Sequence, residues 1–128
     1  MIRSTLSRWF ENEKLDAALD ALEVDNLGYD PWGFSPRDTR PFAKLAYVLY
    51  RYFRPQITGI ENIPEGRVLI VPNHSGQFPF DGMVVGMACL LEGQPPRRCR
   101  AIAECWFQTL PFINIMFSRA GVVVGDPM

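Results

Sequence analysis

The stretch RVLIVPN, residues 67–73, constrains the fold of this chain more than any other segment. Its Val, Leu and Ile residues form a continuous run without polar alternation, and Pro72 ends the run. A strand that is apolar on both sides is typical of a parallel sheet with helices on both faces. We therefore expect this stretch to form a buried core strand, with His74 just past its carboxyl end.

The residues around this strand alternate between strand and helix patterns. The expected elements, in chain order, are a short strand and turn at 56–64, a helix over Gly82–Leu91, a loop with a further strand or helix at 94–106, a helix at 110–121 and a last strand at 122–125. Such alternation predicts the α/β class, with a mixed or largely parallel sheet flanked by helices.

The first 55 residues follow a helical period instead. Apolar residues recur at spacings of three and four in residues 3–23 and again in 42–53, which predicts amphipathic helices. Between them, residues 26–41 collect Gly, Pro, Asn and Asp and indicate an ordered loop. We therefore divide the chain into an amphipathic helical region, 1–55, and an α/β region, 56–128.

The helix predicted at 42–53 has two interpretations. Lys44, Arg51 and Arg54 flank a face that is rich in Tyr and Phe. The helix could pack on the core, or it could lie in a membrane interface, where aromatic rings sit at headgroup depth and cations meet anionic lipid. Both interpretations can hold for different faces of one helix.

Composition excludes several classes of function. The 128 residues carry a net charge of −1, so the chain lacks the overall basic field that nucleic-acid binding needs. The three cysteines lack metal-site spacing, which favours reduced thiols in a cytosolic protein and no structural metal. Charged residues at the start exclude a signal peptide, and the apolar runs fall well short of the roughly 20 residues of a membrane span.

His74, the single histidine of the chain, follows the predicted strand at the edge where open α/β sheets bind ligands. Gly76 allows a turn and Pro79 delays the next helix, so that the carboxylate of Asp81 can fold back to the imidazole. Such a pair can deprotonate an alcohol, because the carboxylate fixes the tautomer and raises the basicity of the other ring nitrogen. The alternative is structural, with Asp81 as the N-cap of a helix that begins at Gly82.

Two segments resemble the motif blocks of a known family. Residues 61–82, ENIPEGRVLIVPNHSGQFPFDG, resemble the first motif block of the glycerolipid (lysophosphatidate-type) acyltransferases, in which a buried strand leads into Asn-His, a short loop and an Asp. Residues 103–126, AECWFQTLPFINIMFSRAGVVVGD, are similar to the second block of that family, a proline-bearing helix followed by Gly and a short apolar strand. The resemblance implies an acyltransferase-type α/β domain.

The resemblance also implies a mechanism. His74 would take a proton from a hydroxyl of a glycerolipid or lysophospholipid, which attacks the thioester of acyl-coenzyme A or an acyl carrier protein. Asp81 would orient His74, while Asn73, Ser75 and Gly76 would shape the substrate-binding loop. A thiolate leaves, so no cofactor or metal is required. Ser75 is a tempting nucleophile, but the chain lacks the G-x-S-x-G elbow.

The chain departs from the family pattern in three respects. Six residues separate His74 from Asp81, a longer loop than usual. Asp126 stands where an arginine commonly grips the acceptor phosphate, and Arg119 is the nearest candidate for that substrate-binding role. The Glu-Gly-Thr-Arg block of the family does not occur before Met128, so we expect an N-terminal fragment whose sheet is incomplete at its C-terminus.

The sequence thus predicts an acyltransferase of phospholipid or glycerolipid metabolism, peripheral or monotopic on the cytoplasmic face of a membrane. Its expected partners are an acyl thioester, a lipid acceptor and the membrane surface, and its oligomeric state stays open. The alternative is a non-catalytic lipid-binding module or a truncated inactive remnant, and a hydrolase that uses Ser75 is a third hypothesis. PPRRCR, residues 95–100, could bind phosphate or could form a solvated surface.

Overall fold

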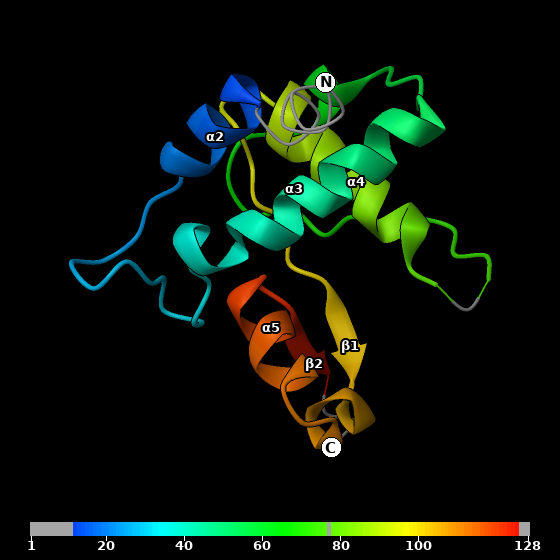
Figure 1. Cartoon of the computed structure of the whole chain (residues 1–128). Helices are drawn as coiled ribbons and strands as arrows, with labels where there is room; N and C mark the ends of the chain where they lie inside the picture. Colours follow the sequence, from blue (N-terminus) through cyan, green and yellow to red (C-terminus); the bar gives the residue numbers. More distant parts are fainter. Residues whose placement is uncertain (1–11, 77, 126–128) are drawn as a thin grey trace, which may run out of the picture.

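The computed structural model describes residues 12–76 and 78–125, which form a layer of helices above a smaller unit built around two strands (Figure 1). The elements, in chain order, are α2 (Glu13–Asp20), α3 (Pro36–Phe53), the 3-10 turn η1 (Ile60–Asn62), α4 (Phe80–Glu92), β1 (Ile102–Glu104), the 3-10 turn η2 (Cys105–Thr109), α5 (Ile113–Arg119) and β2 (Val123–Gly125). Helices α2, α3 and α4 pack against one another, and α5 lies below the start of α3.

Side-chain caps set the starts of the first two helices. Asn12 caps α2, its side-chain oxygen accepting the backbone N–H of Lys14 at 2.9 Å. Ser35 caps α3, and Pro36 follows at a first-turn position that needs no N–H donor. Helix α3 therefore begins six residues before the predicted 42–53, and the expected loop 26–41 ends as a helix. The predicted helix at 3–23 ends at Asp20, and its part before residue 12 lies outside the described residues.

The main core lies where the three helices meet. It consists of small or aliphatic side chains, namely Leu15, Ala18, Leu19, Ala43, Ala46, Met87, Leu90 and Leu91. Ala43 and Ala46 let α3 approach its neighbours closely, and Tyr47 and Tyr50 of the same helix pack against this core. One face of α3 is thus a core face. Among the described residues, no helix combines the length and the apolar character needed to cross a bilayer.

The two strands pair in parallel. Ile102 lies opposite Val123 and Glu104 opposite Gly125, with η2 and α5 forming the connection between the strands. A side-chain carbon at Gly125 would come within 2.9 Å of the Ile102 side chain, so this register favours glycine there. The helix predicted at 110–121 and the last strand at 122–125 are confirmed as α5 and β2. Helices with a small parallel sheet are compatible with the α/β class.

The predicted core strand at 67–73 is wrong for this structure. These residues are not in a strand, and the side chains of Leu69 and Val71 are 79% and 83% exposed. The expected strand within 56–64 is also absent, and that segment holds only the turn η1. The physical reason is that a parallel strand requires a hydrogen-bonded neighbour, and in the described part of the chain β1 pairs only with β2.

A buried carboxylate, Asp30, connects the helical layer to the strand unit. Arg98 Nη1 lies 2.8 Å from Asp30 Oδ2, and Arg100 donates to the same oxygen. The other carboxylate oxygen accepts the backbone N–H groups of Trp32 and Phe34 at 2.8 and 3.0 Å. The two guanidinium groups also lie over aromatic rings, that of Arg98 over Phe34 and that of Arg100 over Trp32. We call these five residues the Asp30 clasp.

The clasp gives two arginines of the PPRRCR segment a role that neither sequence interpretation foresaw. The Asp30 side chain is only 2% exposed. Burial alone would raise the pKa of Asp30, but the N–H groups of Trp32 and Phe34 and the two arginines together hold that pKa below its usual value. Burial and repulsion by Arg100 lower the pKa of Arg98, and the charge of Asp30 acts in the opposite direction. One buried carboxylate thus holds two partly buried cations together.

We expect Asp30→Asn to lower the free energy of unfolding by about 3 kcal/mol, because it leaves two partly buried guanidinium groups without their anion. Urea titration followed by circular dichroism measures the loss. Since the folded-state pKa of Asp30 is depressed, the stabilisation is present above the unfolded-state pKa and is lost as the pH falls through the folded-state value. The difference in the free energy of unfolding between wild type and variant should therefore become smaller in acid. Equal stability at neutral pH would contradict the role of the clasp.

The three free thiols differ in surroundings, which predicts their reactivity. Cys89 is buried in α4, and burial together with contact with the Cys89 thiol raises the pKa of Cys99 to about 12. Cys105 is exposed on η2. Because the thiolate is the reactive form, a maleimide at neutral pH should label Cys105 in the folded protein and the other two only after unfolding. Peptide mass spectrometry measures this order, and rapid native labelling of Cys99 would contradict it.

Candidate active site

His74 and Asp81 are in direct contact. His74 Nδ1 lies 2.7 Å from Asp81 Oδ2 and 2.9 Å from Oδ1. The imidazole is exposed, and within the described residues its Nε2 has no hydrogen-bond partner. The geometry therefore brings together the two residues that the sequence singled out for catalysis and leaves one ring nitrogen accessible.

The loop between them turns back on itself for identifiable reasons. Gly76 has a φ of 98°, in the left-handed region that glycine adopts without strain. The backbone N–H of Phe80 donates to the carbonyl of Phe78 at 2.9 Å, and the N–H of Met83 donates to Pro79 to open α4. Asp81 is consequently the second residue of the helix. The six-residue spacing still allows the pair to meet, because the turn at Gly76 and the early start of α4 reverse the chain.

The helix-cap interpretation of Asp81 needs correction. Helix α4 begins at Phe80 rather than Gly82, and its N-cap is Pro79, which makes no side-chain cap. Asp81 instead accepts N–H groups from Gly82 at 2.8 Å and from Ser75 at 3.1 Å, in addition to its contact with His74. The Gly82 N–H, then His74, and the Ser75 N–H hold the pKa of Asp81 below its usual value. Asp81 is therefore a carboxylate at neutral pH.

An ionised Asp81 sets the tautomer of His74. A carboxylate can only accept, so Nδ1 of the neutral imidazole must carry the hydrogen, and the lone pair resides on Nε2. This is the arrangement of a general base that is oriented by an acid. The exposed Nε2 can receive a proton from a hydroxyl that approaches from solvent or from a lipid surface.

The remaining loop residues surround this pair. Asn73 directly precedes His74 and is exposed, and Ser75 contributes its backbone N–H to Asp81. Among the described contacts, the Ser75 hydroxyl is not hydrogen-bonded to His74, whereas a serine nucleophile needs such a base. The substrate-binding roles expected for Asn73, Ser75 and Gly76 stay predictions.

Arg119 lies at a different place. Its guanidinium lies over the Tyr29 ring at 4.4 Å and 3.7 Å from the Asp38 carboxylate. The backbone carbonyl of Arg119 accepts the N–H of Ser35, so this residue adjoins the start of α3, whereas the His74 loop adjoins its end, roughly 27 Å away along the helix (Figure 1). In this structure Arg119 and His74 are not brought together, and Asp126 lies outside the described residues.

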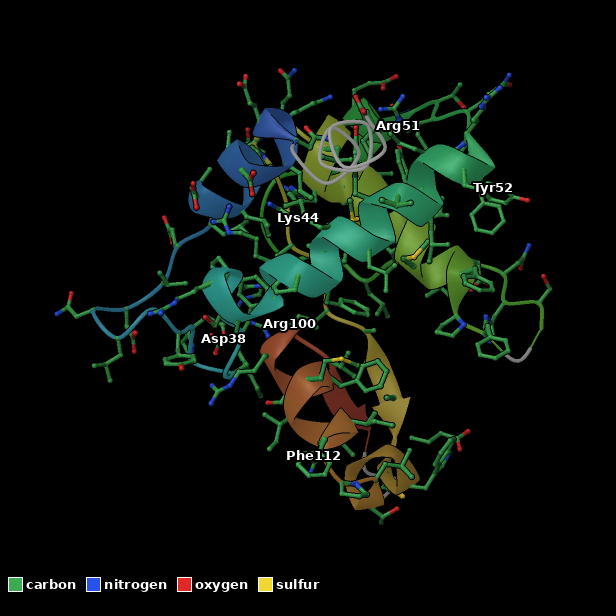
Figure 2. All side chains as sticks on the ribbon, viewed as in Figure 1. Asp38, Lys44, Arg51, Tyr52, Arg100 and Phe112 are labelled. Carbon is green, nitrogen blue, oxygen red and sulfur yellow. The ribbon has the colours of Figure 1, made fainter. Side chains whose placement is uncertain are left out.

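A row of aromatic rings next to His74 was not foreseen as a unit. Tyr52 and Phe53 of α3 contact each other at 5.4 Å between ring centroids, Phe53 contacts Phe80 at 5.6 Å, and Phe80 stacks on Phe78 at 5.8 Å. Figure 2 shows Tyr52 projecting outward from the end of α3. We call these four residues the aromatic row. Its sequence signal is the Phe-Pro-Phe at 78–80, at the junction of the His74 loop and α4.

A hollow of about 310 Å³ lies between η1 and the C-terminal end of α4, with Ile60, Ile63, Cys89 and Arg97 in its lining. It is at the opposite end of α4 from Asp81 and contains neither member of the pair. Within residues 12–76 and 78–125, no three His, Cys, Asp or Glu residues are grouped so that they could hold a metal ion. The His74–Asp81 pair is therefore the chemical centre that the described residues offer.

Comparison with known proteins identifies the family. A protein-family model described as Acyltransferase matches residues 54–127, more than half of the chain. The chain therefore belongs to the acyltransferase family, as its resemblance to the glycerolipid acyltransferases predicted. The matched segment includes His74, Asp81 and the second motif block.

The curated relatives are longer proteins. An uncharacterized protein of Mycobacterium tuberculosis is 36% identical over 99 residues, which cover 77% of this chain and 27% of that protein. An uncharacterized protein of Mycobacterium leprae is 35% identical over 102 residues, or 79% of this chain and 27% of that protein. This chain thus spans about a quarter of the length of these relatives. No solved structure gives a significant match.

We expect the tautomer of His74 to depend on Asp81. In the wild type the neutral imidazole should carry its hydrogen on Nδ1, because the carboxylate accepts it, and Asp81→Ala should release this preference. Long-range ¹H–¹⁵N NMR spectra at alkaline pH distinguish the two tautomers. With a single histidine in the chain the assignment is unambiguous. An Nδ1 lone pair in the wild type would exclude the orientation on which a base role at Nε2 depends.

Proposed function

We propose that the protein transfers an acyl chain from a thioester to a hydroxyl of a glycerolipid or lysophospholipid. The observation that carries this proposal is the His74–Asp81 contact of 2.7 Å within the segment that matches the acyltransferase family. The donor would be acyl-coenzyme A or an acyl carrier protein. The reaction would belong to phospholipid or glycerolipid metabolism and would take place on the cytoplasmic face of a membrane.

In the proposed reaction, Nε2 of His74 accepts the hydroxyl proton as the acceptor oxygen bonds to the thioester carbonyl carbon. Asp81 stabilises the imidazolium that forms, through the contact with Nδ1. The tetrahedral intermediate collapses by breaking the carbon–sulfur bond, and the imidazolium returns the proton to the leaving thiolate. Backbone N–H groups of the loop or of the start of α4 are the proposed donors to the oxyanion. The products are an ester and a free thiol, so the step needs no cofactor.

The acceptor is proposed to be held without the usual arginine after the second block. Asp126 at that position would repel a phosphate, and Arg119 is already engaged with Tyr29 and Asp38. These features favour an acceptor that lacks a phosphate, such as a partial glyceride, or one whose phosphate is bound elsewhere. Comparing a monoacylglycerol with a lysophospholipid at equal concentration separates the two possibilities.

We expect His74→Ala to reduce acyl transfer by about 10²–10⁴-fold, the usual contribution of a positioned general base. The assay follows thiol release from an acyl thioester and ester formation in the presence of a lipid acceptor. Leu27→Ser is the matched control, since Leu27 is 81% exposed. It belongs to the loop between α2 and α3, which lies on the other side of α3 from the loop before α4 (Figure 1). Circular dichroism establishes that both variants fold.

Undiminished turnover in His74→Ala would remove His74 from the mechanism. Lipid binding by the wild type without consumption of thioester would favour the non-catalytic lipid-binding module. Covalent labelling of Ser75 by a serine-directed phosphonate would favour the hydrolase.

A further inference from the structure

The aromatic row is a continuous apolar strip that solvent reaches. The side chains of Tyr52 and Phe78 are 75% and 68% exposed, and Phe53 and Phe80 join them through ring contacts. Four linked rings on the outside of a folded chain are uncommon, and extended apolar patches of this kind mark interaction surfaces. The row therefore has the character of an interaction surface for a partner that covers aromatic groups.

The aromatic residues of α3 lie on two different faces of the helix. Tyr47 and Tyr50 pack on the helical core, whereas Tyr52 and Phe53 point away from it and join the row. Figure 2 shows Tyr52 directed away from the helical layer. The core requirement is already met by the inner face, so the outer rings are not needed to fill the interior.

Basic residues predominate in the segments that carry the row, and the carboxylate of Asp81, which directly follows Phe80, is paired with His74. Residues 50–60 and 66–80 contain Arg51, Arg54 and Arg67 and no Asp or Glu, although the chain as a whole carries a net charge of −1. Arg54 directly follows the last residue of α3 and is exposed. Aromatic rings beside arginines match an anionic lipid interface, where rings lie at headgroup depth and each basic group attracts anionic lipid.

The row is also built into the catalytic loop. Phe78 lies between His74 and Asp81, and Phe80 directly precedes Asp81 in the first turn of α4. A surface that receives Phe78 and Phe80 would therefore hold the exposed imidazole at the same depth. This is the depth at which the glycerol hydroxyls of a membrane lipid are found, whereas a protein partner or a second copy at this face would cover His74.

We infer that the aromatic row, with Arg54 beside it, docks the protein on an anionic membrane and presents His74 to acceptor hydroxyls in the headgroup layer. The inference rests on the proposed acyl transfer for the role of His74, but docking itself is measured without turnover. It assigns the docking to the end of α3 and the catalytic loop.

The test is co-sedimentation of the full chain with vesicles of phosphatidylcholine, with and without phosphatidylglycerol. Tyr52→Ser and Phe78→Ser should each weaken binding to anionic vesicles by about tenfold, because each removes one ring from the interface. Leu27→Ser is the matched control, since it removes an exposed apolar side chain that lies outside the aromatic row, in the loop between α2 and α3. Arg54→Gln should weaken binding about fivefold on anionic vesicles and leave binding to neutral vesicles unchanged.

Several results would overturn the inference. The first is that the wild type does not bind vesicles. The second is that Tyr52→Ser and Phe78→Ser bind as well as the control. The third is that Arg54→Gln weakens binding to neutral and anionic vesicles equally. Sedimentation velocity tests the alternative that the row joins two copies of the chain. In that case the wild type would be dimeric, Tyr52→Ser and Phe78→Ser would be monomeric, and vesicle binding would not change. Arg54→Gln retains every ring, so it tests docking even if an aromatic variant does not fold.

His74→Ala separates this inference from the proposed function. Its vesicle binding should equal that of the wild type, because the row and Arg54 are intact. Row-dependent vesicle binding by a protein that transfers no acyl chain would sustain docking and refute the enzyme. Acyl transfer that depends on His74, together with vesicle binding that does not depend on the row, would sustain the enzyme and refute docking by the row.

Discussion

The carboxylate of Asp30 is the interaction on which the arrangement of the two layers depends. It receives two backbone N–H groups from its own turn and two guanidinium groups from the segment that leads into β1. Beside it, the Ser35 N–H and the Thr39 hydroxyl donate to the carbonyl of Arg119 at the end of α5. The loop before α3 thereby holds both ends of the strand unit, although only short strands form there.

The candidate site, at the other end of α3, also depends on a single carboxylate. Asp81 accepts from His74, Ser75 and Gly82, so that one carboxylate fixes the imidazole, the turn of the loop and the first turn of α4 together. Ring contacts from Phe80 to Phe53 tie this turn to α3. The position of the base is thus determined by the helical layer, while the strand unit is held separately through the clasp.

Sequence patterns predicted the parts of this structure that depend on neighbours along the chain. The helices α4 and α5, the last strand and the positive φ at Gly76 follow from local periodicity and from backbone preference. The His74–Asp81 contact was also predictable, because Gly76 and Pro79 restrict the loop between them. The Asp30 clasp was not, because its partners are about 70 residues apart and a lone Asp in a turn gives no sign of distant arginines.

The error at 67–73 has a different origin. An apolar run indicates burial, but burial of a strand depends on neighbouring strands and covering helices, which the run itself does not specify. The start of α3 at Pro36 was missed because proline is read as a breaker, whereas the first turn of a helix accepts it. The first error concerns whether an element forms at all, and the second concerns where a helix begins.

The exposed segment 68–71 affects the behaviour of the protein at high concentration. An exposed, uncharged apolar stretch that is in no helix or strand can offer its backbone N–H and C=O groups to another chain, which is the usual start of aggregation. Arg67 precedes this stretch and Pro72 follows it. Two copies aligned in parallel would bring like charges together at one end, and Pro72 has no N–H to donate at the other. These flanking residues oppose parallel pairing of two copies beyond the four apolar residues.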